Sequence, residues 1–181
     1  QKMLDEGKTW EHVIQGNREV MGTKIKESIE FIRSVTKKHE RPMAVSFSGG
    51  KDSLATLLLV LDAGLRPKIL FVNTGLEFKE TVEYVHMLAD KLGLELIVEN
   101  ANETFWTNLW SFGPPSKDFR WCCKSCKLGP TTRLIREHYP HGVLNFVGQR
   151  RYESQLREQK GNVWENPWVP GQLAASPVQN W

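Results

Sequence analysis

Residues 45–53 constrain the fold of this chain more than any other stretch, because they read Val-Ser-Phe-Ser-Gly-Gly-Lys-Asp-Ser. A short apolar run, 43–47, stops at the two glycines, and an apolar pattern with helical spacing, 54–61, begins directly afterwards. A strand, a tight turn and a helix N-terminus together favour an anion, because glycine lets the backbone approach and the helix N–H groups point at the ligand. We therefore predict a phosphate-binding turn, with serine hydroxyls and a lysine ammonium as further donors.

The remaining apolar patterns predict strands that alternate with helices. We expect helices at 10–38, 54–63, 78–92 and 151–160, and strands at 43–47, 68–72, 94–98 and 143–147. This order implies an α/β fold: a mostly parallel, twisted, Rossmann-like sheet with helices on both faces. We expect an N-terminal helical lead-in over residues 1–39 and a nucleotide-binding domain over residues 40–181.

Two segments show no clear period. Residues 100–130 are rich in Trp, Phe, Pro and Cys, and we expect a long functional loop there. Residues 161–181 also look irregular, with three prolines and no obvious closing element. We therefore expect the domain to be truncated at its C-terminus, as a piece cut from a longer protein.

Polar clusters follow three of the expected strands, at residues 48–53, 73–77 and 148–151. Ligands of parallel sheets bind at the carboxyl ends of strands, so we expect the three clusters to share one site. Arginine suits the planar, two-point capture of phosphate or sulfonate oxygens, which makes Arg150 and Arg157 candidates for that site.

These clusters resemble the motifs of one family. The pattern Ser-Gly-Gly-Lys-Asp-Ser resembles the PP-loop of the adenine nucleotide alpha-hydrolase superfamily; it is not a Walker A loop, because Val45 stands where the first glycine should be. Residues 71–78 resemble the strand-end segment of phosphoadenosine phosphosulfate (PAPS) reductases, and residues 148–157 resemble their Gly-x-Arg-x-x-Glu-Ser-x-x-Arg motif. The resemblance implies the following nucleotide-binding residues: Ser48, Gly49, Gly50, Lys51, Asp52, Ser53, Asn73, Gly75, Glu77, Lys127, Arg150 and Arg157.

All three cysteines lie between residues 122 and 126, which argues against a disulfide framework and for a reduced, cytoplasmic setting with metal or redox chemistry. Their surroundings resemble the family's Cys-Cys-x-x-x-Lys-x-x-Pro element. In APS reductases the adjacent cysteines ligate a [4Fe–4S] cluster together with a later Cys-x-x-Cys, which this chain lacks. A [4Fe–4S] cluster or zinc at Cys122, Cys123 and Cys126 would therefore need ligands from outside this chain; unligated thiols are the alternative. Neighbouring basic residues favour thiolates.

The resemblance implies sulfonucleotide (PAPS or APS) reductase-like sulfur metabolism, with an adenine nucleotide as ligand and a thiol reductant protein as partner. The family's catalytic thiolate belongs to a Glu-Cys-Gly-x-His type tail that is absent here, so no catalytic residue is named. One alternative is an ATP pyrophosphatase that adenylates a substrate, for instance for RNA thiolation, with Asp52 assisting Mg²⁺. Another is a non-catalytic nucleotide- or metal-binding module.

The remaining features of the composition exclude few classes of function. A net charge of +3 fits an anionic small ligand and does not demand nucleic acid. No apolar stretch approaches the roughly 18 residues of a membrane span. Trp106, Trp110 and Trp121 flank the cysteines and are open to either structural roles or stacking on adenine. The oligomeric state is not predicted.

Overall fold

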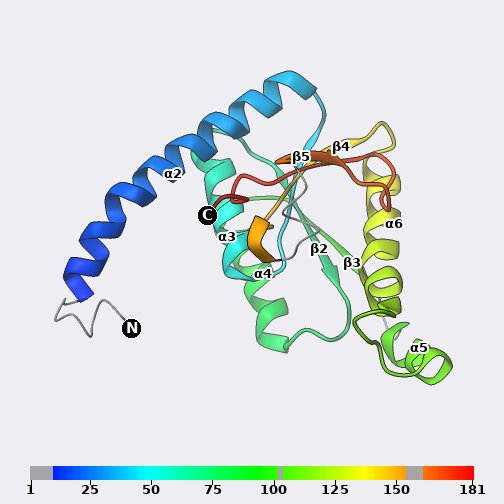
Figure 1. The fold of residues 1–181 in the computed structure, drawn as a ribbon. Helices are drawn as coiled ribbons and strands as arrows, with labels where there is room; N and C mark the ends of the chain where they lie inside the picture. The colour runs from blue at the N-terminus through cyan, green and yellow to red at the C-terminus, as the bar shows by residue number, and fades with distance from the viewer. Residues whose placement is uncertain (1–9, 102–103, 154–160) are drawn as a thin grey trace.

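The computed structural model describes residues 10–101, 104–153 and 161–181, and within them six strands form one sheet of order β3-β2-β1-β4-β6-β5 (Figure 1). The strands are β1 (Met43–Ser46), β2 (Lys68–Asn73), β3 (Leu96–Asn100), β4 (Val143–Val147), β5 (Val163–Glu165) and β6 (Gln172–Ala175). All neighbouring pairs are parallel except β5 with β6. This confirms the expected mostly parallel sheet.

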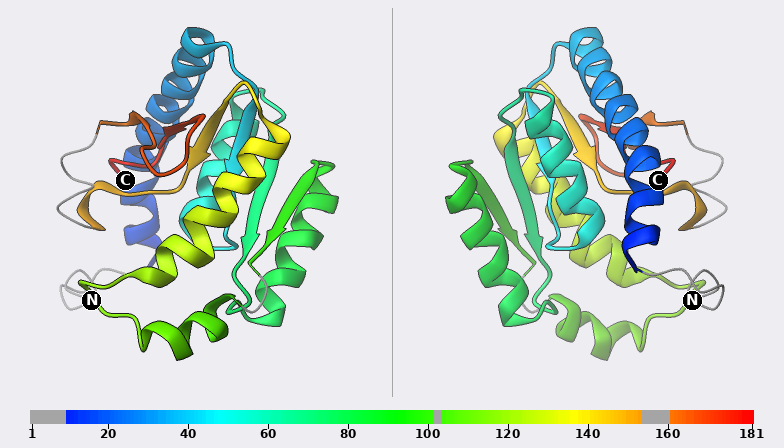
Figure 2. Two further views of the ribbon diagram at one scale, coloured as in Figure 1. Left: turned by 90° about the vertical axis from the view of Figure 1, so that its right-hand side faces the viewer. Right: turned by 90° about the vertical axis from the view of Figure 1, so that its left-hand side faces the viewer.

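Helices cover both faces of the sheet (Figures 1 and 2). They are α2 (Trp10–His39), α3 (Lys51–Asp62), α4 (Lys79–Leu92), α5 (Thr104–Phe112), a π-helix (Cys123–Leu128), α6 (Gly129–His138) and a 3₁₀ turn (Arg151–Glu153). The alternation of β1 shows how the two faces are divided. Val45 packs in a core cluster with residues of α2, α3 and α4, whereas Ala44 packs in another with residues of α6.

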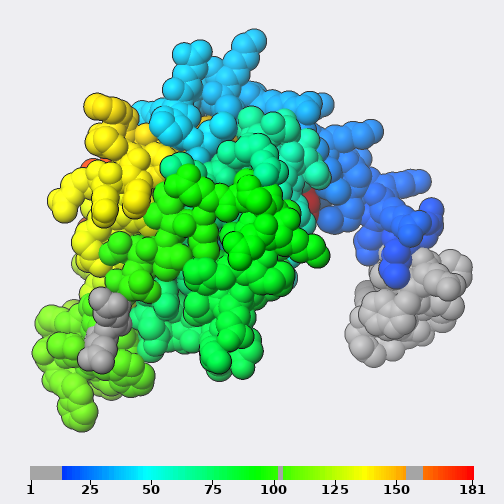
Figure 3. All heavy atoms as spheres, turned by 180° about the vertical axis from the view of Figure 1, so that it is seen from behind, coloured from blue at the N-terminus to red at the C-terminus, as the bar shows by residue number. Residues whose placement is uncertain are grey.

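Helix α2 links the ends of the chain. Its C-terminal half buries Ile32 and Val35 in the core, and its Ser28 hydroxyl donates to the Pro177 carbonyl at 2.8 Å. The Trp181 indole donates to the same hydroxyl at 3.0 Å. The N-terminal half of α2 stands out from the body, as does the α5 segment on the other side (Figure 3).

Two segments that we expected to be irregular contain regular secondary structure. The stretch 100–130 contains α5 and the π-helix; α5 has only nine residues and none of them is fully buried, so its apolar pattern is short and weak. The stretch 161–181 contains β5 and β6, which at 3 and 4 residues are too short to show alternation. All four residues of β6 are buried, so polar and apolar side chains do not alternate there.

Smaller differences lie at helix ends. The helix expected at 54 begins at Lys51, so the polar turn itself supplies the first helical residues. The expected strand 94–98 begins at Leu96, because Gly93 ends α4 in the left-handed conformation and Leu94 N–H still donates to Ala89 O at 3.0 Å. The helix expected at 151–160 begins as a 3₁₀ turn, and its remainder lies outside the described residues.

Candidate functional site

The turn between β1 and α3 is shaped by its glycines. Gly49 has a φ of +76°, and a Cβ atom there would lie 2.8 Å from the Thr81 side chain of α4, so only glycine fits without strain. Gly50 is extended and occupies the N-cap position of α3. Because Gly50 has no side chain to cap the helix, the N–H groups of the first turn of α3 remain available to an anion.

Two serine hydroxyls converge at this helix N-terminus. Ser53 Oγ donates to the Gly50 carbonyl at 2.8 Å and accepts from the Ser48 N–H at 3.3 Å. The Ser48 and Ser53 hydroxyls are themselves 3.3 Å apart. Hydroxyls can donate or accept by rotating, so this pair can turn its hydrogens toward a phosphate or sulfate oxygen.

The end of β4 presses against the same turn. A Cβ atom on Gly148 would lie 2.5 Å from the Asp52 carbonyl carbon and 2.6 Å from the Ser53 backbone nitrogen, so no side chain fits there. Two residues further on, Arg150 Nη2 lies 3.1 Å from Asp52 Oδ2, and both side chains are only 21% and 25% exposed. The structure therefore brings the first and third polar clusters into direct contact.

The second polar cluster forms a locally closed turn ahead of α4. The Glu77 carboxylate accepts hydrogen bonds from the Thr74 N–H and hydroxyl, both at 2.8 Å. Asn73 Oδ1 accepts from the Gly75 N–H at 3.0 Å, and Gly75 has a φ of +79°. Asn73, Gly75 and Glu77 do not line the cavity described next, and their contact with adenosine stays a prediction.

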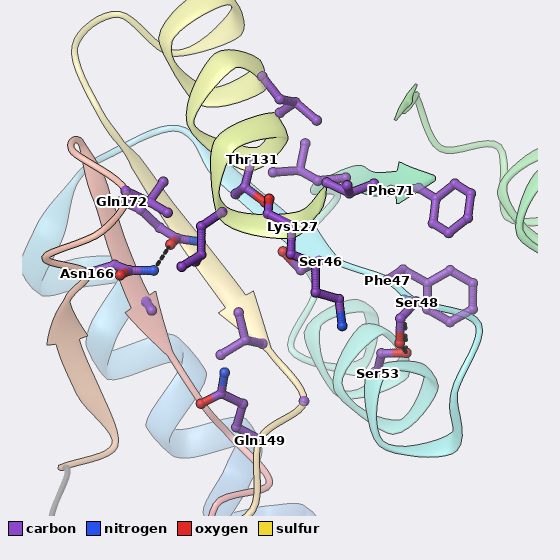
Figure 4. A pocket seen from close by; sticks show the side chains of 18 of the residues that line it. Ser46, Phe47, Ser48, Ser53, Phe71, Lys127, Thr131, Gln149, Asn166 and Gln172 are labelled. Carbon is purple, nitrogen blue, oxygen red and sulfur yellow. Dashed lines mark hydrogen bonds between the residues drawn. The ribbon is translucent and has the colours of Figure 1, made fainter. Parts of the chain in front are cut away.

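A cavity of about 450 Å³ opens at the carboxyl ends of β1 and β4 and extends to β5 and β6 (Figure 4). Its volume lies within the range of small-molecule sites. One end carries the polar groups of Ser48, Ser53, Lys127 and Gly148. The other lining residues are Ser46, Phe47, Leu70, Phe71, Val72, Leu128, Thr131, Leu134, Val147, Gln149, Trp164, Asn166, Trp168, Val169, Gln172 and Ala174.

Lys127 brings a positive charge into this cavity from the π-helix that leads into α6. It lies near the end of the π-helix, and Figure 4 shows its ammonium reaching toward Ser48 and Ser53. The Thr131 hydroxyl donates to the Lys127 carbonyl at 2.7 Å and so ties it to α6. Wide helical turns of this kind occur frequently at functional sites. A lysine, two hydroxyls and a helix N-terminus facing one space can hold a multiply charged anion.

The wall formed by β5 and β6 was missed by sequence reasoning. Trp164 and Trp168 line the cavity, as do Asn166 and Gln172, whose side-chain amides are hydrogen-bonded at 2.6 Å. The tryptophans considered for stacking lie elsewhere: Trp121 is buried and donates to the Gly113 carbonyl. The only available signal was composition, because two tryptophans and two amides stand within nine residues of an unpatterned segment.

The three cysteines lie at or near the start of the π-helix and differ in exposure. All three are free thiols; Cys123 is exposed, Cys126 is buried, and Cys122 is intermediate. Among the described residues, no group of three or more His, Cys, Asp or Glu side chains is placed to hold a metal ion. The donor set therefore does not fit a preformed cluster or zinc site. Burial, and secondarily the neighbouring Cys123, raises the pKa of the Cys122 thiol, which is opposite to the expected thiolate.

Arg157 lies outside the described residues. None of the described helices has the length and apolarity needed to cross a membrane.

The glycine-shaped turn between β1 and α3, set at the carboxyl ends of a parallel sheet, together with the family match below, places this chain in the class of PP-loop α/β proteins. More specifically, the chain belongs to the phosphoadenosine phosphosulfate reductase domain family, whose model matches residues 42–181.

Sequence relatives agree with this assignment. The chain is 38% identical over 170 residues to the uncharacterized protein MJ0066 of Methanocaldococcus jannaschii, covering 93% of this chain and 35% of that protein. It is 30% identical over 150 residues to adenosine 5'-phosphosulfate reductase of Chelativorans sp., covering 80% of this chain and 57% of that protein. The chain thus spans about a third of the first of these two proteins and about three fifths of the second.

Solved structures share the fold. The PAPS reductase of Candida auris, in a phosphate complex, superimposes with a TM-score of 0.61 at 17% identity, covering 96% of this chain and 81% of that one. The FMN adenylyltransferase of Candida glabrata, with FMN and an ATP analogue, gives a TM-score of 0.66 at 14% identity, covering 88% of this chain and 51% of that one.

Proposed function

We propose that this domain binds a sulfonucleotide, APS or PAPS, as the nucleotide-binding part of a larger protein of sulfur metabolism. One observation carries the proposal: Ser48, Ser53 and Lys127 face a single cavity beside the N-terminus of α3. Hydroxyls, free helix N–H groups and one ammonium suit the phosphosulfate group of such a nucleotide. The family supports adenosine as the remainder of the ligand.

Each predicted residue has a place in this proposal. Ser48, Ser53 and Lys127 line the cavity and are assigned to the anionic group, and Gly49, Gly50 and Lys51, which do not line it, are assigned to the same group from the adjoining turn. Asp52 holds Arg150 at the rim of the turn, from which the guanidinium can also meet a sulfonate oxygen. Asn73, Gly75 and Glu77 are assigned to the ribose side of the adenosine, and Arg157 to the remaining negative charge; both assignments are proposals.

The proposed chemistry is reductase-like and needs a thiolate from outside this chain. That thiolate attacks the sulfur of the bound nucleotide, a sulfur–sulfur bond forms, the sulfur–oxygen bond to the phosphate breaks, and AMP or PAP leaves with the electron pair. The domain's share is to bind and orient the phosphosulfate and to neutralise charge on the leaving phosphate. A thiol reductant protein would then release the sulfur as sulfite. Three free cysteines fit the reduced, cytoplasmic setting that this proposal includes.

A calorimetric titration tests the proposal. The protein is titrated separately with APS, PAPS and ATP, and we expect APS or PAPS to bind at least about tenfold more tightly than ATP, a difference of about 1.4 kcal/mol. Pyrophosphate release from ATP is measured in parallel. Tighter binding of ATP together with pyrophosphate release would contradict the proposal and support an adenylating enzyme instead.

A further inference from the structure

The α5 segment, residues 104–121, exposes aromatic rings to solvent. Trp110 is 90% exposed and Trp106 is 54% exposed, and both belong to α5. Phe112 ends α5 and Phe119 follows in the loop; each is 53% exposed, and their rings meet edge to face at 6.3 Å. Figures 1 and 3 show this segment standing out from the body. We call the four rings the aromatic platform.

A more buried layer of rings supports the aromatic platform. The Phe105 ring lies 5.3 Å from that of Trp106 and 5.3 Å from that of Trp121. Trp121 is buried, lies 6.0 Å from the Phe112 ring and donates from its indole N–H to the Gly113 carbonyl at 3.0 Å. The exposed rings are therefore fixed in place by their neighbours. Exposed apolar patches of this kind mark interaction sites.

The charge around the platform is complementary to an anionic partner. Residues 104–128 contain one acidic side chain, Asp118, and four basic ones: Lys117, Arg120, Lys124 and Lys127. Lys117 and Arg120 flank Phe119, and both are exposed. Arg120 Nε donates to the Lys117 carbonyl at 3.0 Å, which holds its guanidinium beside the loop. Within the described part of the chain neither side chain forms an ion pair, so both charges are available to a partner.

We propose that the aromatic platform binds single-stranded nucleic acid, with bases stacked on its rings and phosphates beside Lys117 and Arg120. Every base has a flat π-face, and proteins hold unpaired strands with aromatic rings next to cationic side chains. A lipid surface or an apolar protein partner would be served equally well by aliphatic side chains. Residues 104–121 are all described, and every large apolar side chain that is exposed there is aromatic. None of the platform rings lines the nucleotide cavity, so this second site does not depend on the proposed function.

Fluorescence anisotropy of a labelled strand tests the site. The probe is a fluorescein-labelled RNA strand of mixed sequence, about 12 nucleotides long, beside a DNA strand of the same sequence. We expect a saturable Kd for the RNA strand that excess AMP does not change. Equal Kd values for the two strands would support binding through stacking and phosphates alone, and tighter RNA binding would add contacts to the ribose hydroxyls.

An RNA duplex of the same sequence is the control for stacking. It should bind at least about tenfold more weakly than the single strand, because paired bases cannot stack on the platform. Equal affinity for the duplex, displacement of the strand by AMP, or the absence of strand binding at low salt would each overturn the proposal. None of these results would remove the proposed sulfonucleotide function.

Variants of Trp110 separate stacking from simple apolar contact. Trp110→Leu keeps an apolar side chain but removes the ring, and we expect it to raise the Kd for the RNA strand about tenfold. Trp110→Phe keeps a ring and should raise this Kd less than about threefold. Met87→Ala, which shortens an exposed side chain on α4, should leave it unchanged. Equal losses in the two Trp110 variants, or no loss in either, would overturn stacking at this site.

Salt dependence tests the charged part of the proposal. Lys117→Met should reduce the slope of log Kd against log salt concentration by about 0.7, the contribution of one phosphate contact on a single strand. Lys91→Met removes an exposed charge near the C-terminal end of α4 and should leave the slope unchanged. Sedimentation with vesicles of equal phosphatidylcholine and phosphatidylserine completes the series. Binding to these vesicles without binding to the strand would assign the platform to a membrane surface and overturn the proposal.

Discussion

The two ends of the cavity are built in different ways. The phosphate turn, residues 48–53, is local: its shape comes from Gly49 and Gly50, and its hydroxyls bond to one another within six residues. The β5–β6 wall is assembled from short strands and from side chains that meet only because β6 inserts between β4 and β5. The anion end is therefore encoded by a local motif, whereas the β5–β6 wall depends on tertiary packing. The following variants test that difference.

The largest effect is expected where β4 touches the phosphate turn. In Gly148→Ala the new methyl group would overlap the Asp52 carbonyl and the Ser53 nitrogen, which are backbone atoms that cannot rotate away. We expect a loss of about 3 kcal/mol in the free energy of unfolding, at the upper end for overpacking, and a loss of AMP binding of roughly 100-fold or more. Thermal denaturation and calorimetry measure the two effects.

Gly161→Ala is the matched control for this substitution. Its added Cβ would meet only the Val163 carbonyl oxygen, at an ordinary 3.7 Å. It should leave AMP affinity unchanged. If Gly148→Ala binds AMP as the wild type does, β4 does not shape the turn in the way described here.

The second-largest effect is expected when the positive charge of Lys127 is removed from the anion end of the cavity. Lys127→Met keeps the length of the side chain and removes its ammonium, so we expect a loss of about 2 kcal/mol in AMP binding, or roughly 30-fold, because a charged hydrogen bond to phosphate disappears. Binding should also become less sensitive to salt. Titrations at two ionic strengths measure both changes. Lys117→Met, a charge removed from an exposed loop, is the comparison, and an equal loss there would mean that general charge, not position, matters.

The third-largest effect is expected on stability, at the ion pair between Arg150 and Asp52. Arg150 and Asp52 are about four-fifths and three-quarters buried, so we expect Arg150→Met to lower the free energy of unfolding by about 1–2 kcal/mol. In the double variant Arg150→Met with Asp52→Asn, the loss should be smaller than the sum of the single losses, since no unpaired charge remains. Urea denaturation measures this cycle. Lys79→Met, which breaks an exposed pair with Glu83, should cost only about 0.3 kcal/mol, and strict additivity in the cycle would contradict the coupling.

The smallest effect is expected on the rates at which the cysteines are alkylated. Because burial raises the pKa of Cys122, less of this thiol is ionised at neutral pH, and its alkylation rate should keep increasing up to a higher pH than that of an unburied thiol. Exposed Cys123 should react faster with iodoacetamide at pH 7.5. Mass spectrometry of timed samples follows both sites, with Cys126, which is buried, as the slow reference. Faster labelling of Cys122 than of Cys123 would contradict this reading of their surroundings.

The sequence predicted strands β1 to β4 but neither β5 nor β6, for physical reasons. Strands β1, β2 and β4 are buried apolar runs of four to six residues next to glycines, so their patterns are strong. Strands β5 and β6 are short, and β6 begins with a buried glutamine, which reads as surface in a sequence. The cluster 48–53 could be placed from its glycines, and its contact with residues 148–150 followed from strand ends that meet in a parallel sheet.

Other parts of the site could not be predicted from local pattern. Lys127 enters the cavity because a π-helix replaces the expected loop, and no periodic signal marks that turn. Asn166 and Gln172 meet through a turn whose geometry depends on the pairing of β5 with β6. The basic neighbours of Cys122 suggested a thiolate, but burial depends on packing around Trp121 and α5, which composition does not reveal.

The most direct measurement follows backbone amide chemical shifts while AMP is added to the ¹⁵N-labelled protein. If this cavity is the nucleotide site, the amides of Gly49 to Ser53, Lys127 and Gly148 shift together and saturate with one Kd, because they surround one bound anionic group. Shifts confined to another surface, or no saturable shift in the residues of the phosphate turn, would contradict the claim that this cavity is the nucleotide site.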